Sequence, residues 1–477
     1  MLEAGIVHPK NVTNILFKNM IDASLAAFVF WAVGYGVGWG NTGGGFIGTS
    51  NWGIGTKDCA IRAGVGNDST SDGWEQWFIQ WGFVAKAVSI VAGSVAERTA
   101  VHAYFIYSCV FSIFIYPVVA HWVWGQGFLS YYAAIGSTAP GYPKPIIFGP
   151  SASNGLIDFA GCGVVHMVGG FTGMVGAIII GPRTGRFVDG QVVELYSGNK
   201  TLQALGVFIL WFGWYGFNCG STLGLGGNNA NIAAKVAVNT TLGAAMGGIV
   251  TTFLGKLIFG CYDISMGLNG VLAGLVSVTA NCHLVEPWHA IVIGSAASII
   301  LLLGHFLLKK LKIDDPCDAA VVHGFCGIWG LWAAGIFCID SNVEYMGYPK
   351  SEACRTGQQF AVQIVGSLCI FAWTVGTSAI MFLIMKYTVG VRISQTAEDM
   401  GLDASEHGAG FLTDMGELEP AKPPPTQQLQ QPAAMIQHMQ PPVSQYAPVQ
   451  YVQQFPTNNY PISTINGTPP PVSFGRA

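Results

Sequence analysis

The sequence predicts an all-α polytopic membrane protein, built as an inverted repeat of two five-helix halves followed by a final helix. Three observations predict this fold. The 477 residues are 51% hydrophobic and 10% charged, the apolar residues gather in long uninterrupted segments, and a stretch of the first half recurs in the second half. Soluble domains are about 25% charged. The low charge therefore disfavours the alternative, a soluble protein with one very large core.

Ten apolar segments are long enough to cross about 30 Å of hydrocarbon at ~1.5 Å per residue. The content of 64 Gly and 14 Trp suits helices that pack closely in lipid and rings that sit at the interfaces. We therefore expect these segments to be spanning helices. They cover residues 13–39, 75–97, 100–123, 157–181, 201–218, 231–257, 263–283, 287–308, 318–338 and 358–388.

The repeated stretches are residues 158–166 and 315–323. Both place Asp, Val-Val and His at the same spacing, and two glycines follow each His at the same offsets. The number of spans between them makes the two copies enter the membrane from opposite sides. An inverted repeat of this kind is typical of transporters, whose working site lies between the halves near the midplane.

The repeat also indicates a missing helix. The second half has five predicted spans, within residues 201–338, and its His lies in the fifth, whereas the first-half His lies in the fourth. We expect a further helix before residue 13, of which residues 1–5 would be the end, and no signal peptide takes its place.

Three regions are predicted: a transmembrane domain at 1–393, a cytoplasmic regulatory segment at 394–419 and a disordered cytoplasmic tail at 420–477. The tail is rich in Pro and Gln with almost no charge, so it buries too little apolar surface to fold. Lys and Arg gather in the loops that contain residues 183–186 and 309–312, which predicts that this end of the helices is cytoplasmic.

The loops at the opposite end are then extracellular. They contain the sequon at residues 67–69, a candidate for glycosylation, and Cys59, Cys338 and Cys354, two of which can form a disulfide; the sequence leaves the pairing open. The net charge of -4 argues against nucleic acid as a partner. The Cys and His spacings match no zinc site, and we expect no cofactor.

Two histidines lie inside predicted spans, where an ionisable group is costly and indicates function. His166 and His323 each lie eight residues, about 12 Å, beyond an Asp. We expect both neutral imidazoles to meet near the middle of the membrane and share a hydrogen bond. The alternatives are simple packing and a metal site, and the metal site lacks a third ligand on the adjacent turns.

The aspartates that begin the repeats can act as helix caps. Asp158 at the start of its span either caps free amides or stabilises a cation that arrives from outside. For Asp315 and Asp318, at the other end, capping is the expected role.

Five stretches in order resemble the ammonium transporter/methylammonium permease/Rhesus family. They are DFAGCGVVHMVGGFTGMVGAIIIGPR at 158–183, GSVAER at 93–98, FNCGS at 217–221, DDPCD at 314–318 and the segment 401–408. The resemblance covers about residues 1–410 and is closer to the ammonium transporter branch. It implies 11 spans, about ten of them present here, and a homotrimer with one pore per subunit in the lipid of the plasma membrane.

The resemblance also implies the residues of a transport path for ammonium or ammonia, with methylammonium as a further candidate substrate. The outer cation site corresponds to Phe83, Trp124 and Ser221, with Asp158 nearby. A gate of stacked rings corresponds to Phe83 and Phe217, and the pore histidines to His166 and His323. Without the family, Trp124 reads as an interfacial anchor, the phenylalanines as packing, and Ser221 as a cap.

Lys86 lies one turn from Phe83 inside a span. It either reaches a membrane face or an acidic partner, or it faces the pore and repels cations. Two functions compete with transport: an ammonium sensor that signals through its tail, and a membrane enzyme, for which the sequence offers no nucleophile and base beyond the His pair.

Overall fold

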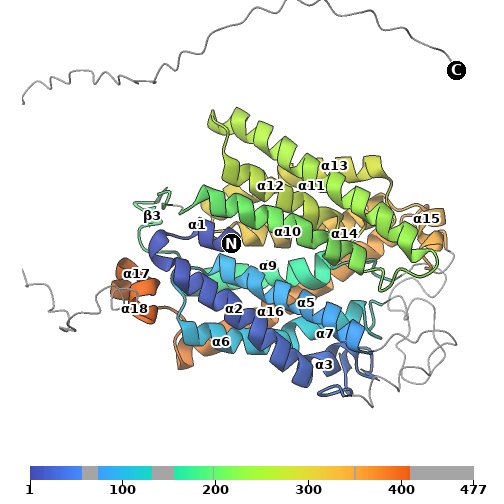
Figure 1. Cartoon of the computed structure of the whole chain (residues 1–477), viewed down its shortest axis with the longest axis horizontal. Helices are drawn as coiled ribbons and strands as arrows, with labels where there is room; N and C mark the ends of the chain where they lie inside the picture. The colour runs from blue at the N-terminus through green and yellow to red at the C-terminus, as the bar shows by residue number, and fades with distance from the viewer. Residues whose placement is uncertain (56–72, 131–154, 197, 349–350, 409–477) are drawn as a thin grey trace, which may run out of the picture. The chain divides into compact units, whose positions relative to one another are not determined.

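A computed structural model describes residues 1–55, 73–130, 155–196, 198–348 and 351–408, all within the unit Met1–Leu418. The described chain is almost wholly helical, with two short antiparallel hairpins, β1–β2 (Thr42–Gly43, Ile47–Gly48) and β3–β4 (Phe187–Val188, Gln191–Val192). Figure 1 shows the first-half helices, blue to cyan, in the lower part of the view and the second-half helices, green to yellow, in the upper part.

Each of the ten predicted spans contains helix, and the all-α polytopic fold is confirmed. Several spans consist of successive helices that continue one another. The first-half elements are α1 (Leu2–Ile6), η1 (Pro9–Asn11), α2 (Val12–Val29), η2 (Phe30–Gly34), α3 (Tyr35–Trp39), α5 (Gly73–Ser94), α6 (Val101–Val110), η4 (Phe111–Ile115), α7 (Tyr116–Val123), η5 (Cys162–Met167) and α9 (Val168–Ile180).

The remaining helices belong to the second half and the C-terminal segment. They comprise α10 (Lys200–Gly220), α11 (Asn229–Phe259), α12 (Ile264–Val278), α13 (Pro287–Lys310), η6 (Ala320–Phe325), α14 (Cys326–Ile336), α15 (Asp340–Tyr345), α16 (Gln358–Thr388), α17 (Gln395–Met400) and α18 (Leu402–His407). Among the described residues, six helical segments are long and apolar enough to cross a membrane by length and composition, and Ile264–Val278 and Ala320–Ile336 are shorter apolar helices.

The repeat extends to the backbone at the two histidines. His166 lies in η5 and His323 in η6, and both segments are single π-helical turns that continue into an α-helix. A π-helical turn inside an α-helix is rare and is often found at functional sites. The two halves also approach each other closely here: a Cβ on Gly170 would lie 2.4 Å from the Gly324 amide nitrogen. Glycine at 170 is therefore what lets the two His-bearing segments meet.

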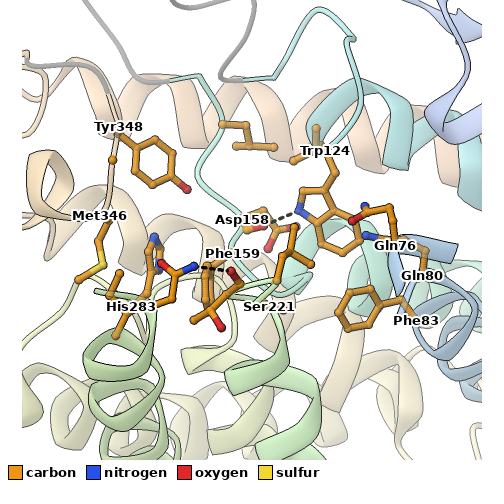
Figure 2. A pocket seen from close by; sticks show the side chains of 17 residues that line it. Gln76, Gln80, Phe83, Trp124, Asp158, Phe159, Ser221, His283, Met346 and Tyr348 are labelled. Carbon is orange, nitrogen blue, oxygen red and sulfur yellow. Dashed lines mark hydrogen bonds between the residues drawn. The ribbon is translucent and has the colours of Figure 1, made fainter. Parts of the chain in front are cut away.

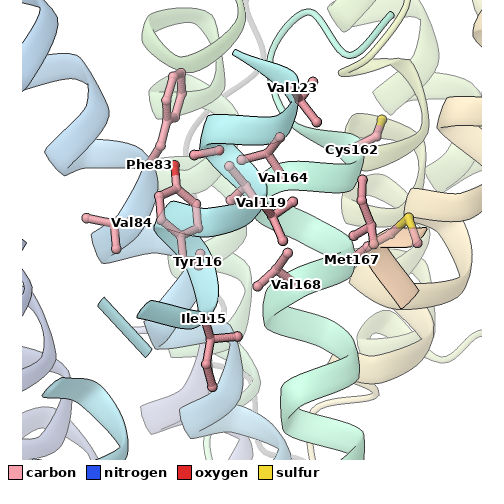
Figure 3. Close-up of a cluster of buried hydrophobic side chains, with 14 of the residues drawn as sticks. Phe83, Val84, Ile115, Tyr116, Val119, Val123, Cys162, Val164, Met167 and Val168 are labelled. Atoms are coloured by element: carbon pink, nitrogen blue, oxygen red, sulfur yellow. The ribbon is translucent and has the colours of Figure 1, made fainter. Parts of the chain in front are cut away.

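Buried aliphatic and aromatic side chains of α5, η4, α7, η5 and α9 form a continuous cluster beside this junction (Figure 3). Phe83, Tyr116 and Val164 are among them, each at most 3% exposed. In a bilayer the lipid tails are as apolar as these side chains, so close packing rather than escape from water stabilises the cluster. The cluster fixes the position of α5 relative to η5.

Ion pairs join the halves at the end of the helices that contains Arg183, which we call the Arg183 end. The Arg183 guanidinium donates to both carboxylate oxygens of Asp314, at 2.8 and 2.9 Å, and also to Glu97. Arg98 is fully buried and donates to the carbonyls of Ala96, Gly181 and Asp314. These contacts tie α5, α9 and the loop before η6 together.

We predict that this junction weakens in acid. Burial acts to raise the pKa of Asp314, but the hydrogen bonds and charge of Arg183 outweigh it and lower the pKa from 3.8 to about 2. A carboxylate with a lowered pKa stabilises the fold above its ordinary pKa, and this contribution, on the order of 2 kcal/mol, is lost as the pH falls from about 4 towards 2. The denaturation temperature of the purified protein in detergent should fall in that range, and Asp314→Asn should lower it at neutral pH and flatten the acid response. An equal acid response in both proteins would contradict the prediction.

The segment after α16 docks on the N-terminus of α2. Both carboxylate oxygens of Asp403 accept hydrogen bonds from the backbone amides of Thr13 and Asn14, at 3.0 and 2.8 Å. The Lys10 ammonium donates to the carbonyls of Glu398 and Asp399. The part of the predicted regulatory segment that is described is thus attached to the helices, while residues 409–477 lie outside the described residues.

A disulfide joins Cys338 and Cys354, which settles one pairing that the sequence left open. Cys59 and the sequon at 67–69 lie outside the described residues. The disulfide links the end of α14 to the start of α16 across α15, at the end of the helices that contains Trp124, the Trp124 end.

Candidate functional site

A cavity of about 340 Å³ opens at the Trp124 end, and we call it the vestibule. Four residues that the sequence predicted for the outer site line it together: Phe83, Trp124, Asp158 and Ser221 (Figure 2). They come from α5, α7, the segment before η5 and the end of α10. Since a water molecule occupies about 30 Å³ in the liquid, the vestibule has room for a small ion with most of its hydration shell.

Trp124 is held in place from two sides. It follows directly on α7 as the C-cap residue, and its ring nitrogen donates to the carbonyl oxygen of Asp158 at 2.7 Å. The centroid of its ring lies 5.3 Å from that of Phe83. The ring of Trp124 thus lines the cavity, as the resemblance implied.

The two phenylalanines of the predicted gate are in contact, but the prediction that they stack is wrong. The rings of Phe83 and Phe217 lie 4.5 Å apart at 72°, edge to face. This geometry places the positive edge of one ring against the negative face of the other, which aromatic pairs prefer to direct stacking. Phe83 is 3% exposed, so the pair forms an apolar floor beneath the vestibule.

Ser221 follows α10 and turns its hydroxyl back to the helix. The hydroxyl donates to the carbonyl of Phe217 at 2.9 Å. Because the proton is used in this bond, the two lone pairs of the oxygen remain as acceptors. Ser221 can therefore offer an acceptor to a cation in the vestibule.

Asp158 is buried, and its carboxylate caps the turn that leads into η5. One oxygen accepts from the amide of Gly161 at 3.1 Å, and the other from Gly163 and Val164 at 2.9 and 3.0 Å. These bonds satisfy the free amides of the helix start and leave the negative charge at the vestibule wall. Capping, one of the two roles that the sequence left open, is therefore present in the structure.

Of the two aspartates at the start of the second repeat, Asp315 caps its helix and Asp318 does not. Asp315 accepts hydrogen bonds from the amides of Cys317 and Ala320 and caps its turn, as expected. The capping prediction for Asp318 is wrong: its carboxylate pairs with the ring of His305, at 2.9 and 3.0 Å. The carboxylate bonds to a ring on another helix, α13, and spacing along the local sequence cannot predict such a contact between helices.

The two histidines meet as predicted. The Nδ1 atoms of His166 and His323 are 3.1 Å apart, and both side chains are buried, at 0% and 7% exposure. Two nitrogens share one proton in such a bond, so one ring donates and the other accepts. Trp214 stacks on His166 at 5.2 Å and 14°. The Nε2 atom of His166 is buried and has no hydrogen-bond partner within the described residues.

The rings are arranged in sequence from the vestibule inwards. Phe83 contacts Phe217, the Phe217 ring lies 5.7 Å from that of His166, and His166 bonds to His323. The row of rings thus leads from a partly polar cavity, past apolar side chains, to two imidazoles. Within the described ranges, no three His, Cys, Asp or Glu side chains gather to hold a metal ion.

Lys86 is half-buried on α5, on the side of Phe83 away from the vestibule. The charged group of opposite sign that acts on it is the carboxylate of Glu3 on α1. Glu3 is thus an acidic neighbour of Lys86, as one of the sequence interpretations allowed, and the part that Lys86 plays in transport stays a prediction.

Sequence reasoning missed most of the other residues that line the vestibule, among them Gln80 and His283. Gln80 lies one turn before Phe83 on α5, and this spacing could have indicated it. His283 was counted as the last residue of the predicted span 263–283. In the structure α12 ends at Val278 and the next residues form tight turns, so His283 lies in a turn at the vestibule wall.

The fold and site define a multi-pass membrane transporter built from two inverted halves. The sequence profile of the Ammonium Transporter Family matches residues 1–411. The chain belongs to this family, whose named members are transporters and not enzymes.

Curated relatives and solved structures agree with this assignment. Ammonium transporter Amt2 of Archaeoglobus fulgidus is 38% identical over 416 residues, which cover 86% of this chain and 83% of the relative. Ammonium transporter 1 member 1 of Arabidopsis thaliana is 37% identical and covers 86% and 81%. The structure of a Sensor Amt Protein matches with a TM-score of 0.72 at 30% identity over 85% and 92%, and Saccharomyces cerevisiae Mep2 with 0.69 at 26% over 82% of each chain.

Proposed function

We propose that this chain transports ammonium by taking the cation into the vestibule, removing its proton and passing neutral ammonia between the two histidines. The observation that carries the proposal is the alignment of the vestibule, the Phe83–Phe217 pair and the His166–His323 pair along one line of ring contacts. In this path, Trp124, Phe83 and Ser221 receive the cation, and Asp158 supplies negative charge at the wall.

The energies favour loss of the proton over passage of the ion. An ammonium ion against an indole face gains ~0.5–2 kcal/mol, and the Ser221 oxygen replaces a lost water. Moving the bare ion into the apolar path costs far more, up to tens of kcal/mol in the Born limit. Deprotonation near neutral pH costs about 1.36 kcal/mol per pK unit, a few kcal/mol in all. Potassium has no proton to lose, so the same barrier excludes it.

The remaining parts of the proposal concern the setting of the pore. The Arg183 end is cytoplasmic and the vestibule faces outwards, because Lys and Arg gather in the loops of the Arg183 end. The chain acts as a homotrimer in the lipid of the plasma membrane, with its C-terminal tail inside, and residues 394–419 act as a regulatory segment. The docking of α17 and α18 on α2 supports this role, since it links the segment to a spanning helix.

The proposal predicts uptake of labelled methylammonium by yeast cells that lack their own ammonium transporters. Uptake should saturate, compete with ammonium and resist a large excess of potassium, because the path selects for a removable proton. The same assay on a chain that ends after residue 419 measures what the tail contributes. Surface expression without uptake, in both forms, would contradict transport.

A sensor is the second candidate function, favoured by the similarity to a structure titled Sensor Amt Protein. A sensor needs the vestibule but not the path beyond Phe217. It would bind ammonium in the purified state and give no flux in the uptake assay, which separates the two candidates.

A further inference from the structure

A second group of side chains faces the vestibule across from Trp124. Figure 2 shows His283, Met346 and Tyr348 to the left of the cavity and Trp124, Gln80 and Phe83 to the right. The left-hand group comes from the turn after α12 and the loop after α15, which the outer-site prediction did not include. Within this group, His283 carries two polar ring nitrogens at the vestibule wall.

The backbone around His283 is held firmly. The amide of Asn239 on α11 donates to the carbonyls of Cys282 and Val285, both at 2.8 Å, one on each side of His283. Asn342 of α15 donates to the carbonyl of Leu284 at 2.8 Å. The ring position is therefore fixed by two neighbouring helices and does not depend on the ring itself.

The ring is oriented by stacking. It lies on Phe159 with centroids 4.2 Å apart and an angle of 12° between the planes. Phe159 in turn bonds through its amide to the carbonyl of Ala280, so the stack belongs to the same turn that carries His283. Stacking uses the ring face and leaves the ring edge, with both nitrogens, free of the stack.

The side chain of His283 is only 1% exposed, and both of its ring nitrogens are buried without a hydrogen-bond partner within the described chain. The amide oxygen of Gln80, on the other side of the vestibule, is unpaired in the same way. A buried polar atom without a partner carries a desolvation cost, and native proteins rarely keep one without a reason. A ligand with N–H donors would relieve the cost at both positions.

Burial, and after it the positive charge nearby, disfavours the protonated form of the imidazole. The charged group that acts on His283 is Lys235, which pairs with Glu286 at 3.1 Å, and no carboxylate pairs with the ring within the described chain. A proton moved from ammonium to this ring would place a cation where it is poorly solvated and beside Lys235. The ring is therefore suited to accept a hydrogen bond and unsuited to act as the base.

We propose that His283 is a second cation-binding residue of the vestibule, where one ring nitrogen accepts a hydrogen bond from an N–H of ammonium and replaces a water of its hydration shell. The proposal deepens the transport function proposed above and rests on it for the identity of the cation. The vestibule then has two subsites, an imidazole on one side and the Trp124–Ser221 site on the other.

His283→Phe tests the proposal because it keeps the stack on Phe159 and removes both nitrogens. We expect the KM for methylammonium uptake to rise about 3- to 10-fold, with a smaller change in Vmax, since one hydrogen bond to a charged donor is lost. His283→Gln retains an acceptor oxygen and should lie closer to the unchanged protein. His102→Phe is the matched control, since His102 is exposed at the Arg183 end and bonds to the carbonyls of Val389 and Gly390.

A binding measurement separates this proposal from the proposed transport. Ammonium chloride is titrated into the purified full chain and followed by tryptophan fluorescence, with sodium chloride as the control. A Kd raised by His283→Phe in a protein without flux would support the subsite and contradict transport. An unchanged Kd and KM in His283→Phe would overturn the subsite. Should that variant not reach the membrane, His283→Leu replaces it, and the same outcomes decide.

Discussion

Asp158→Ala is expected to reduce methylammonium uptake to background, the largest effect of any single substitution in this chain. The substitution removes three hydrogen bonds to the amides of Gly161, Gly163 and Val164 and the negative charge at the vestibule wall. The turn that leads into η5 would lose its cap. This turn contains the Asp158 carbonyl, which accepts the hydrogen bond of the Trp124 ring, so we expect both Trp124 and the η5 turn with His166 to shift.

The isosteric variant separates the two roles of Asp158. Asp158→Asn keeps one acceptor oxygen and loses the charge. Uptake near background in both variants, at unchanged surface expression, indicates that the charge matters, while recovery in Asp158→Asn indicates that the cap does. Uptake close to the unchanged level in Asp158→Ala would remove Asp158 from the transport path.

His166→Ala and His323→Ala are expected to alter conduction far more than surface expression. Each removes the Nδ1–Nδ1 bond and leaves a gap that water can enter, which in His166→Ala lies beside Trp214. A wet path no longer requires the proton to leave, so we expect lower selectivity against potassium together with changed flux. Currents and labelled uptake, both normalised to surface protein, measure the two effects.

The control for the histidines is another buried His with a purely structural environment. His121 is buried on α7 and bonds to the carbonyl of Gly38 and the hydroxyl of Thr42, so His121→Ala should lower expression and flux together. The same proportional loss in the His166 and His323 variants would mean that these residues only support folding.

The repeat in the sequence predicted the arrangement of the two histidines well. Equal spacing of Asp, Val-Val and His in segments that enter from opposite sides placed both imidazoles at one depth, and their Nδ1 atoms lie 3.1 Å apart. The ten helical segments followed from length and hydropathy for the same reason: in lipid every backbone polar group must be bonded within the segment, so a long apolar run forms a helix.

The sequence predicted the details of the vestibule less well. The angle between the rings of Phe83 and Phe217 depends on how α5 and α10 pack. The carboxylate of Asp318 bonds to His305 on α13 and not to the amides of its own helix start. His283 was assigned to the end of a span, because hydropathy gives no sign that α12 stops at Val278 and turns. Each of these features depends on contacts between segments far apart in the chain.

The sequence by itself determined the class of fold, the twofold repeat and the meeting of the two histidines, since these depend on the spacing of residues along single segments. Only the tertiary structure decided which side chains share the vestibule and that Cys338 pairs with Cys354. It also decided that His283 lies buried at the vestibule wall without a hydrogen-bond partner among the described residues. The physical reason is that hydrogen bonding within a span is local, whereas a cavity is formed by the packing of several spans and the turns between them.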